Sequence, residues 1–290
     1  MLLESVAYAR PDSIAEAIQA LAGNDGAAPL AGGQSLVNVL KHRVASIELL
    51  VDISRLEELR AIELRGDGTL DIGACVTYDE IDRSASLRSV HPLLADVAGH
   101  IEDQQIRCRG TIGGNCCLSD PTNNLPPLLV ALDATMVIES AAGRREVAAG
   151  EFFHGYFATA VGEGEMLRSV RVPPLGAGAG AGYSTVAVGA DSKAIARAAA
   201  VVRSNDTIDD ARVVLACVSP TPSRHTGMEQ ALRGAAASSE AVRAAAERIG
   251  EDLEPIGDAH GSAEYRREMA RVVARRAVSQ AIVRGGLDRG

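Results

Sequence analysis

Two short glycine-rich stretches carry the residues best suited to binding chemistry in this sequence. The first reads AGGQSL over residues 31–36, and the second reads TIGGN over residues 111–115. Glycine permits positive φ and lets a ligand approach the main chain, while the neighbouring Ser, Thr and Asn add short polar groups. Consecutive backbone N–H groups in such loops can form a concave anion-binding site.

The spacing of these glycines excludes two common nucleotide motifs. Neither G-x-G-x-x-G nor G-x-x-x-x-G-K-[ST] occurs in either stretch, so they predict neither a Rossmann turn nor a P-loop. An apolar pattern at Leu36, Val39 and Leu40 follows the first stretch, which indicates a turn leading into a helix N-terminus that favours phosphate. One such turn is often only a tight loop, but two in one domain favour a diphosphate ligand.

The remaining reactive side chains form no recognised catalytic or metal-binding pattern. The five cysteines, Cys75, Cys108, Cys116, Cys117 and Cys217, include no C-x-x-C, so we expect free thiols and no zinc or iron–sulfur site. The 6 histidines and 38 acidic residues form no H-E-x-x-H or Ser/His/Asp spacing, so we expect no hydrolytic site.

Composition limits the class of protein. The formal net charge of −9 argues against nucleic acid as a partner. The opening MLLESVAYARPDS lacks a basic segment followed by an apolar one, and no apolar run reaches the ~20 residues of a membrane span, so we expect a cytoplasmic chain. Aromatic residues are only 3 % of the chain, so Ala, Leu, Val and Ile must fill the core.

Apolar periodicity and turn residues predict three lobes, at residues 1–54, 55–175 and 176–290, in an α+β fold. Ser13 and Glu16 predict the start of the first helix, and Thr77 and Glu80 that of another. The small-residue run 176–182 is expected to be a flexible connection. The predicted strands are 28–30, 49–53, 59–64, 69–74, 135–139, 145–147, 167–172, 196–203 and 211–218. The predicted helices are 14–22, 93–101, 125–132, 227–232, 239–249, 263–283 and one beginning at Leu36.

Several segments besides the glycine stretches resemble one known family. They are the opening VAYARPDSIAEAI, the DPTNNLPPLLVALDA that follows the second stretch, FFHGYFAT from Phe152, and the closing YRREMARVVARRAVSQA. Together they resemble the FAD-binding medium subunits of the molybdenum hydroxylases, a family that includes bacterial carbon monoxide and xanthine dehydrogenases. The resemblance implies a two-lobed FAD-binding domain of the PCMH type, followed by a lobe of antiparallel sheet and helices.

The resemblance also implies roles for individual residues. The first glycine stretch would hold the FAD pyrophosphate, and the second would approach the flavin or ribitol. Asn124 stands where relatives often have an Asp that bonds the adenosine ribose, and Asp120 is a nearby acid whose alternative role is to cap the turn at Pro121. The implied FAD-binding residues are Ala31, Gly32, Gly33, Gln34, Ser35, Leu36, Thr111, Gly113, Gly114, Asn115, Asp120, Asn124 and Lys193.

Residues in three regions modify this expectation. Covalent flavoproteins of this fold commonly use a His in the first loop, so Gln34 predicts noncovalent FAD. After Tyr183, relatives commonly carry a Lys and then an Arg where this chain has Thr185 and Gly189, and Lys193 is a candidate replacement. The loss of these charges argues against NAD as the electron acceptor. Arg107 and Arg109 could pair with pyrophosphate or with acidic groups on a neighbouring surface.

The function implied is that of an FAD-carrying electron-transfer subunit. Electrons would come from [2Fe–2S] clusters on a small partner, after substrate oxidation at a molybdenum cofactor on a large partner, in an expected dimer of heterotrimers. No catalytic residue is then expected on this chain beyond the flavin. Two alternatives stay open: a free-standing FAD oxidase or reductase of the same fold, and a non-redox nucleotide-binding scaffold.

Overall fold

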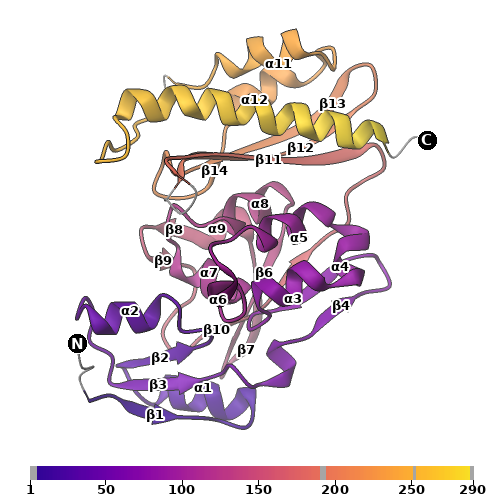
Figure 1. Ribbon diagram of the computed structural model, residues 1–290. Coiled ribbons are helices and arrows are strands. Elements are labelled where there is room, and N and C mark those ends of the chain that lie inside the picture. Colours follow the sequence, from indigo (N-terminus) through magenta and orange to yellow (C-terminus); the bar gives the residue numbers. More distant parts are fainter. Residues whose placement is uncertain (1–4, 190–193, 251–252, 288–290) are drawn as a thin grey trace. The chain divides into compact units, whose positions relative to one another are not determined.

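The computed structural model describes residues 5–189, 194–250 and 253–287 (Figure 1). The chain forms two compact units. Unit 1 comprises Met1–Ser119 and Ala134–Pro173, and unit 2 comprises Asp120–Asp133 and Pro174–Gly290. The chain therefore crosses between the units at three places, and the short segment Asp120–Asp133 belongs to unit 2 although unit 1 flanks it in sequence. The division into three lobes stays a prediction.

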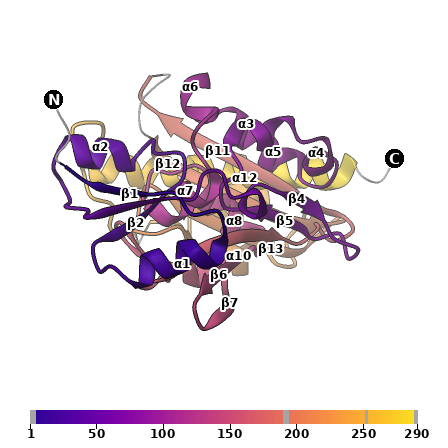
Figure 2. The ribbon, with the colours of Figure 1, turned by 90° about the horizontal axis from the view of Figure 1, so that it is seen from below.

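A small parallel sheet opens unit 1, in the strand order β1-β3-β2. Helix α1 lies along one face of this sheet (Figure 2), with Ile14, Ala17, Ile18 and Leu21 buried as predicted. Ser13 caps α1 by accepting a hydrogen bond from the Glu16 amide. The elements are β1 (Ala7–Ala9), α1 (Ile14–Ala22), β2 (Ala27–Leu30), α2 (Leu36–Lys41) and β3 (Leu49–Asp52).

A five-stranded antiparallel sheet, in the order β4-β5-β10-β6-β7, forms the rest of the unit 1 framework. Its strands are β4 (Ile62–Leu64), β5 (Leu70–Gly73), β6 (Thr135–Ser140), β7 (Gly143–Ala148) and β10 (Met166–Val172). The helices are η1 (Glu57–Leu59), α3 (Tyr78–Arg83), α4 (Ala85–Val90), α5 (Pro92–Gly99), α6 (Gln104–Arg107), α7 (Ile112–Leu118) and α9 (Ala149–Phe152). Strands β8 (Phe153–Gly155) and β9 (Ala158–Thr159) form a separate hairpin. The predicted capping box between Thr77 and Glu80 is present at the start of α3.

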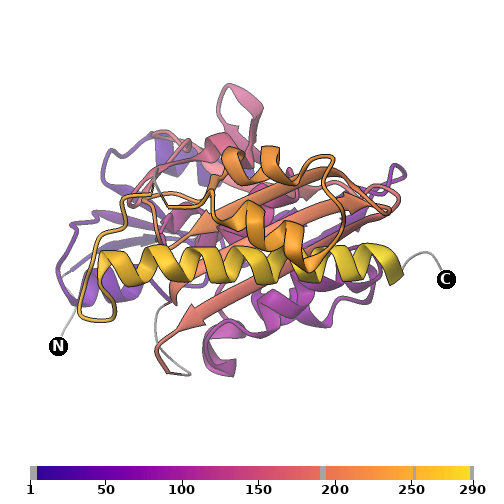
Figure 3. The same ribbon diagram turned by 90° about the horizontal axis from the view of Figure 1, so that it is seen from above.

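Unit 2 is an antiparallel sheet, in the order β11-β12-β13-β14, with helices on both faces (Figure 1). Helix α12 runs along β11 and β12 (Figure 3), and the apolar α8 packs on β12 and β13. The strands are β11 (Ala179–Ala187), β12 (Ala194–Ser204), β13 (Ile208–Ala216) and β14 (Ser223–Arg224). The helices are α8 (Leu125–Ala131), α10 (Thr226–Leu232), α11 (Ser239–Ala246) and α12 (Ala263–Leu287). This architecture confirms the predicted α+β class.

The small-residue run at 176–182 is not the flexible connection that its composition indicated. Most of it lies in β11, and its glycines let α12 approach the strand closely. A Cβ atom on Gly180 would lie 2.2 Å from the Ala281 carbonyl oxygen, and one on Gly182 would lie 1.9 Å from that of Ala277. The prediction was wrong because composition does not reveal which backbone packs against a glycine.

Candidate functional site

The two glycine stretches meet inside unit 1. A Cβ atom on Gly32 would lie 1.9 Å from the carbonyl oxygen of Arg109 and 3.1 Å from the Cα atom of Gly110. No side chain fits at position 32 while this contact exists. The absence of a side chain therefore brings the turn after β2 against the backbone that leads into α7.

The first stretch presents a row of unused hydrogen-bond donors. Gly33 has a φ of +71°, in the left-handed region that favours glycine. The backbone amides of Gly32, Gly33, Gln34 and Ser35 have no acceptor within the described part of the chain. The Gln34 side chain turns back to donate to the Gly32 carbonyl at 3.3 Å, and the Ser35 hydroxyl makes no capping bond to α2. Consecutive free amides of this kind suit an anion.

The second stretch is the start of helix α7 rather than an open loop. Thr111 is the N-cap, and its Oγ1 accepts from the Gly114 amide at 3.0 Å. The Ile112 and Gly113 amides donate to the Val76 and Ala74 carbonyls at 3.0 and 2.9 Å. Because these donors are already used, the role of anion donor falls to the first stretch. The second stretch instead offers its exposed backbone at Gly114.

Two buried side chains support this backbone from within. Asn115 is 8 % exposed, and its Nδ2 donates to the Tyr78 hydroxyl at 3.0 Å. Burial raises the pKa of Tyr78, so its hydroxyl stays protonated at neutral pH. A Cβ atom on Gly110 would lie 2.5 Å from the Tyr78 ring, so the aromatic side chain packs directly against the glycine backbone. The sequence indicated only the helix start at Thr77 and gave no signal for Tyr78.

The two arginines beside the second stretch differ in their contacts. The Arg107 guanidinium is used locally, with donors to the Ile101 carbonyl at 3.1 Å and to Gln104 Oε1 at 3.0 Å. The Arg109 side chain is exposed, and its guanidinium makes no hydrogen bond or ion pair with the residues that the structure describes. Of these two cations, Arg109 is therefore the one available to a ligand or partner.

The remaining predicted residues belong to unit 2 or lie outside the description. Asp120 Oδ1 accepts from the Thr122 amide at 2.8 Å and from its hydroxyl at 2.6 Å, so the carboxylate caps the turn as in the alternative interpretation. Asn124 occupies the N-cap position of α8 without a side-chain capping bond. Lys193 lies outside the described residues. The structure thus brings residues 31–36 and 111–115 together within unit 1, and it holds Asp120 and Asn124 in one turn of unit 2.

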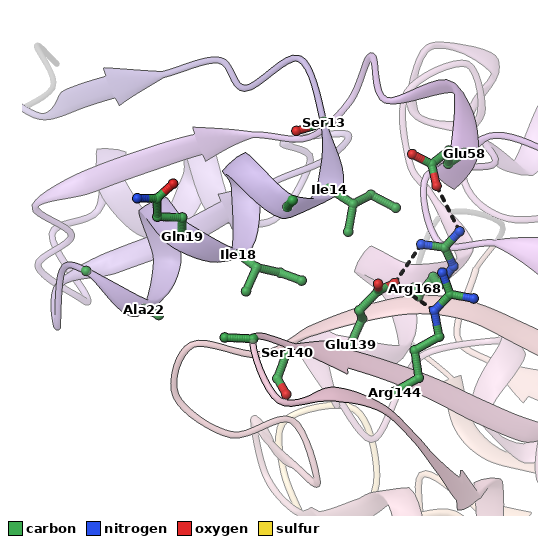
Figure 4. A pocket seen from close by; sticks show the side chains of 13 residues that line it. Ser13, Ile14, Ile18, Gln19, Ala22, Glu58, Glu139, Ser140, Arg144 and Arg168 are labelled. Atoms are coloured by element: carbon green, nitrogen blue, oxygen red, sulfur yellow. Dashed lines mark hydrogen bonds and ion pairs between the residues drawn. The ribbon is translucent and has the colours of Figure 1, made fainter.

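A groove of about 700 Å³ lies elsewhere in unit 1, beside α1 and β6 (Figure 4). Its charged side chains are paired with one another. Arg168 contacts Glu139 at 2.6 Å and Glu58 at 3.0 Å, and Arg144 contacts Glu139 at 3.2 Å. None of its lining residues comes from the glycine stretches, so this groove is separate from the candidate site.

Neither a metal cluster nor a membrane helix is found in the described ranges. No group of three or more His, Cys, Asp or Glu side chains is placed to hold a metal there. No helix within the same ranges is long and apolar enough to span a bilayer.

Two family profiles match the chain. The FAD binding domain in molybdopterin dehydrogenase matches residues 4–175, and the CO dehydrogenase flavoprotein C-terminal domain matches residues 182–281. The boundary between the two matches falls where the chain enters unit 2 for the second time.

Named relatives are similar over nearly the whole chain. The carbon monoxide dehydrogenase medium chain of Hydrogenophaga pseudoflava is 39% identical, over 96% of this chain and 97% of that protein. The glyceraldehyde dehydrogenase medium chain of Sulfolobus acidocaldarius is 35% identical, over 94% and 97%. Among solved structures, quinoline 2-oxidoreductase from Pseudomonas putida 86 matches with a TM-score of 0.93 and 31% identity, covering 98% of this chain and 99% of that chain. The chain therefore belongs to the family of FAD-binding medium subunits of the molybdenum hydroxylases, which are oxidoreductases.

Proposed function

We propose that this chain is the FAD-carrying electron-transfer subunit of a molybdenum-containing hydroxylase. The observation that carries the proposal is the row of free amides from Gly32 to Ser35, held against the backbone before α7. A pyrophosphate needs several fixed donors in a site without bulk water, and these amides supply them. When bound, FAD would supply stepwise uptake of electrons and their release as a pair.

The residues present fit such a cofactor. The amides of residues 32–35 and the Ser35 hydroxyl would hold the pyrophosphate, with Ala31 and Leu36 flanking them. Thr111, Gly113, Gly114 and Asn115 would form the wall next to the flavin or ribitol, with Gly114 as the exposed surface. Asn124 would bond the adenosine ribose through its amide, from a turn that Asp120 stabilises. Lys193 stays a candidate for the positive charge that relatives place after Tyr183.

The proposal includes partner subunits. Relatives are named medium chains of dehydrogenases, and a medium chain implies a large and a small one. We place the molybdenum cofactor on the large partner and the [2Fe–2S] clusters on the small one, in a dimer of heterotrimers. A cytoplasmic location is part of the proposal, supported by five free cysteines.

The cofactor and its linkage are tested by isolating the chain and recording a visible spectrum. Flavin absorption bands are expected, because the free amides and the glycine surface both suit FAD. Acid precipitation should release the flavin into the supernatant, because Gln34 offers no linking nucleophile. Flavin retained on the precipitate would contradict noncovalent binding, and a colourless protein that cannot be reconstituted with FAD would favour the scaffold alternative.

The subunit role is tested by activity with and without partners. The isolated chain is expected to bind FAD but to oxidise no aldehyde, N-heterocycle or carbon monoxide. Coexpression with the large and small subunits should restore turnover. Substrate oxidation by the single chain, in a preparation shown to contain no molybdenum, would support a free-standing flavin oxidase instead.

A further inference from the structure

Arg197 is a buried cation without a carboxylate partner in the described part of the chain. It lies on β12 with 4 % of its surface exposed, and no acidic side chain there is within ion-pair distance of it. Its Nη1 donates to the carbonyl oxygens of Thr122 and Asn123, the latter at 2.8 Å. Its Nε donates to Thr185 Oγ1 at 3.1 Å. A buried charge is costly unless it is hydrogen-bonded, so these contacts fix the side chain and its acceptors together.

Tyr183 adds a second attachment to the same turn. Its hydroxyl donates to the Asn124 carbonyl at 2.8 Å, and its ring centroid lies 5.9 Å from the Arg197 guanidinium carbon. That distance allows a cation–π contact. Desolvation raises the pKa of Tyr183 to about 12, so the hydroxyl is a protonated donor at neutral pH. Three successive carbonyls, at residues 122–124, are therefore held by side chains of β11 and β12.

This attachment determines what the turn can present to a ligand. The Asp120 carboxylate accepts from Thr122, and the three carbonyls accept from Arg197 and Tyr183 of the sheet. The side-chain amide of Asn124 makes no hydrogen bond with the described residues. With the backbone fixed in this way, the Asn124 amide is a polar group of the turn that, among the described residues, stays available to a ligand.

The register of β11 and β12 accounts for the position of the cation. Thr185 and Arg197 are directly opposite each other in the sheet. Thr185 stands where the family resemblance expects Lys. At this point of the sheet the chain therefore carries its positive charge on the neighbouring strand, where it reaches the carbonyls of the turn.

We propose that Arg197 is a positioning residue for the nucleotide half of FAD: together with Tyr183 it fixes the turn that presents Asn124 to the adenosine ribose. The assignment rests on the proposed function, since it requires FAD to be the ligand. A planar guanidinium is required because one side chain must bond two carbonyls and a hydroxyl while stacking on a ring. The ammonium group of Lys is a point charge on a flexible stem and reproduces this arrangement only in part.

The test compares FAD with FMN, which lacks the adenosine, in the full-length chain and its variants. Dissociation constants for both flavins are measured for Arg197→Met, Arg197→Lys and Tyr183→Phe, together with hydrogen exchange of the amides of residues 122–124. The matched control is Arg266→Met. Arg266 is another buried arginine of unit 2, 6 % exposed, and it donates to the carbonyls of Ile195 and Cys217 at 2.9 and 3.2 Å rather than to the turn. Unlike Arg197, it also pairs with a carboxylate, that of Asp258 at 2.8 Å.

Arg197→Met is expected to weaken FAD binding about tenfold, with FMN binding unchanged and faster exchange in the turn. The FAD dissociation constants of Arg197→Lys and Tyr183→Phe should lie between those of Arg197→Met and the wild type. Arg266→Met should lower thermal stability without changing the ratio of the two dissociation constants. If Arg197 only stabilised the fold, its replacement would weaken the binding of FAD and of FMN equally.

An unchanged FAD-to-FMN ratio in the Arg197 and Tyr183 variants, with a wild type that binds FAD, would overturn this assignment and leave the proposed function intact. A wild type that binds no FAD would overturn the proposed function and the assignment with it. If Arg197→Met does not fold, the ratio of the FAD and FMN dissociation constants is measured in the milder variants Arg197→Lys and Tyr183→Phe, and it tests the assignment in the same way.

Discussion

Gly32 and Gly33 are adjacent, yet they are glycines for different physical reasons. Gly32 has no room for a Cβ atom, because the Arg109 carbonyl occupies that space. At Gly33 a Cβ atom would make only a tight contact, 3.3 Å from a Val37 side-chain carbon, but the φ of +71° is unfavourable for other residues. Substitutions at the two positions should therefore have different effects on packing and on backbone strain.

Gly32→Ala is expected to abolish measurable FAD binding. Its methyl group would lie 1.9 Å from the Arg109 oxygen, so the two glycine stretches must separate. Flavin content per chain, from the ratio of visible to ultraviolet absorbance, measures the effect, and a thermal melt reports the accompanying loss of stability. Gly66→Ala is the control, because a Cβ atom there meets nothing within 4 Å. Full flavin occupancy in Gly32→Ala would show that the contact between the stretches is not needed for binding.

Gly33→Val and Gly114→Val should both lose FAD, and each should also destabilise the chain, for a different reason. An L-residue in the left-handed region costs about 1–2 kcal/mol, and a β-branched side chain adds to this. Gly114 is exposed, but a Cβ atom there would lie 2.9 Å from Thr111 Oγ1, so Val would disturb the N-cap of α7 as well as fill the surface expected to face the cofactor. Denaturant unfolding of the cofactor-free proteins measures the loss of stability in each variant. Retention of flavin by both variants would place the cofactor elsewhere.

His91 should make unit 1 less stable in acid. The side chain is 2 % exposed, its Nε2 lies 2.8 Å from the Pro173 carbonyl oxygen, and burial lowers its pKa from the ordinary 6.5. Below pH 6.5 the unfolded chain takes up this proton before the folded one does. The free energy of unfolding should therefore fall by up to about 1.4 kcal/mol per pH unit until the folded pKa is reached.

The check on His91 is to measure unfolding from pH 7 down to pH 5 in the wild type and in His91→Gln. Glutamine keeps a donor for the Pro173 carbonyl but does not titrate in this range. The variant should lose less stability than the wild type as the pH falls. Equal slopes for the two proteins would contradict a role for His91.

At the scale of elements, the contact between β11 and α12 depends on glycine in unit 2. Gly182→Ala should destabilise unit 2 by about 1–3 kcal/mol, the usual cost of overpacking, because its methyl group would lie 1.9 Å from the Ala277 carbonyl. Gly286→Ala on α12 is the control. A Cβ atom there meets nothing within 4 Å, and Ala favours a helix over Gly. Guanidinium unfolding followed by circular dichroism gives both values, and equal stability of the two variants would contradict the close approach.

Elements with local signals could be predicted, whereas those that depend on distant packing could not. The apolar stripe of α1, the capping box at Thr77 and the β12–β13 hairpin each follow from residues close in sequence, and all are present. The glycine pattern indicated the candidate site, which stays a prediction, but it gave no indication that TIGGN starts a helix. Arg197 gave no signal either, because the two carbonyls that it binds lie more than seventy positions earlier in the chain.

At the scale of the whole molecule, family membership could be predicted because several separated segments matched together. The passage of Asp120–Asp133 into unit 2 could not, since its flanking residues belong to unit 1. Contacts with the rest of unit 2 hold both ends of this segment. Arg197 binds the carbonyls near its start, and Arg212 pairs with Asp133 at its end. Side chains thus connect pieces of unit 2 that the sequence separates.

This interleaved path has a consequence for synthesis on the ribosome. Every residue of α8 is buried in the finished protein, yet its partners β12, β13 and β14 are translated later. At about 5–20 residues per second, roughly 4–20 s pass between the emergence of α8 and that of β14. The apolar helix α8 therefore lacks the strands that bury it while the nascent chain grows. Chaperones that recognise exposed apolar segments should engage the chain in that interval and release it once β14 has been made.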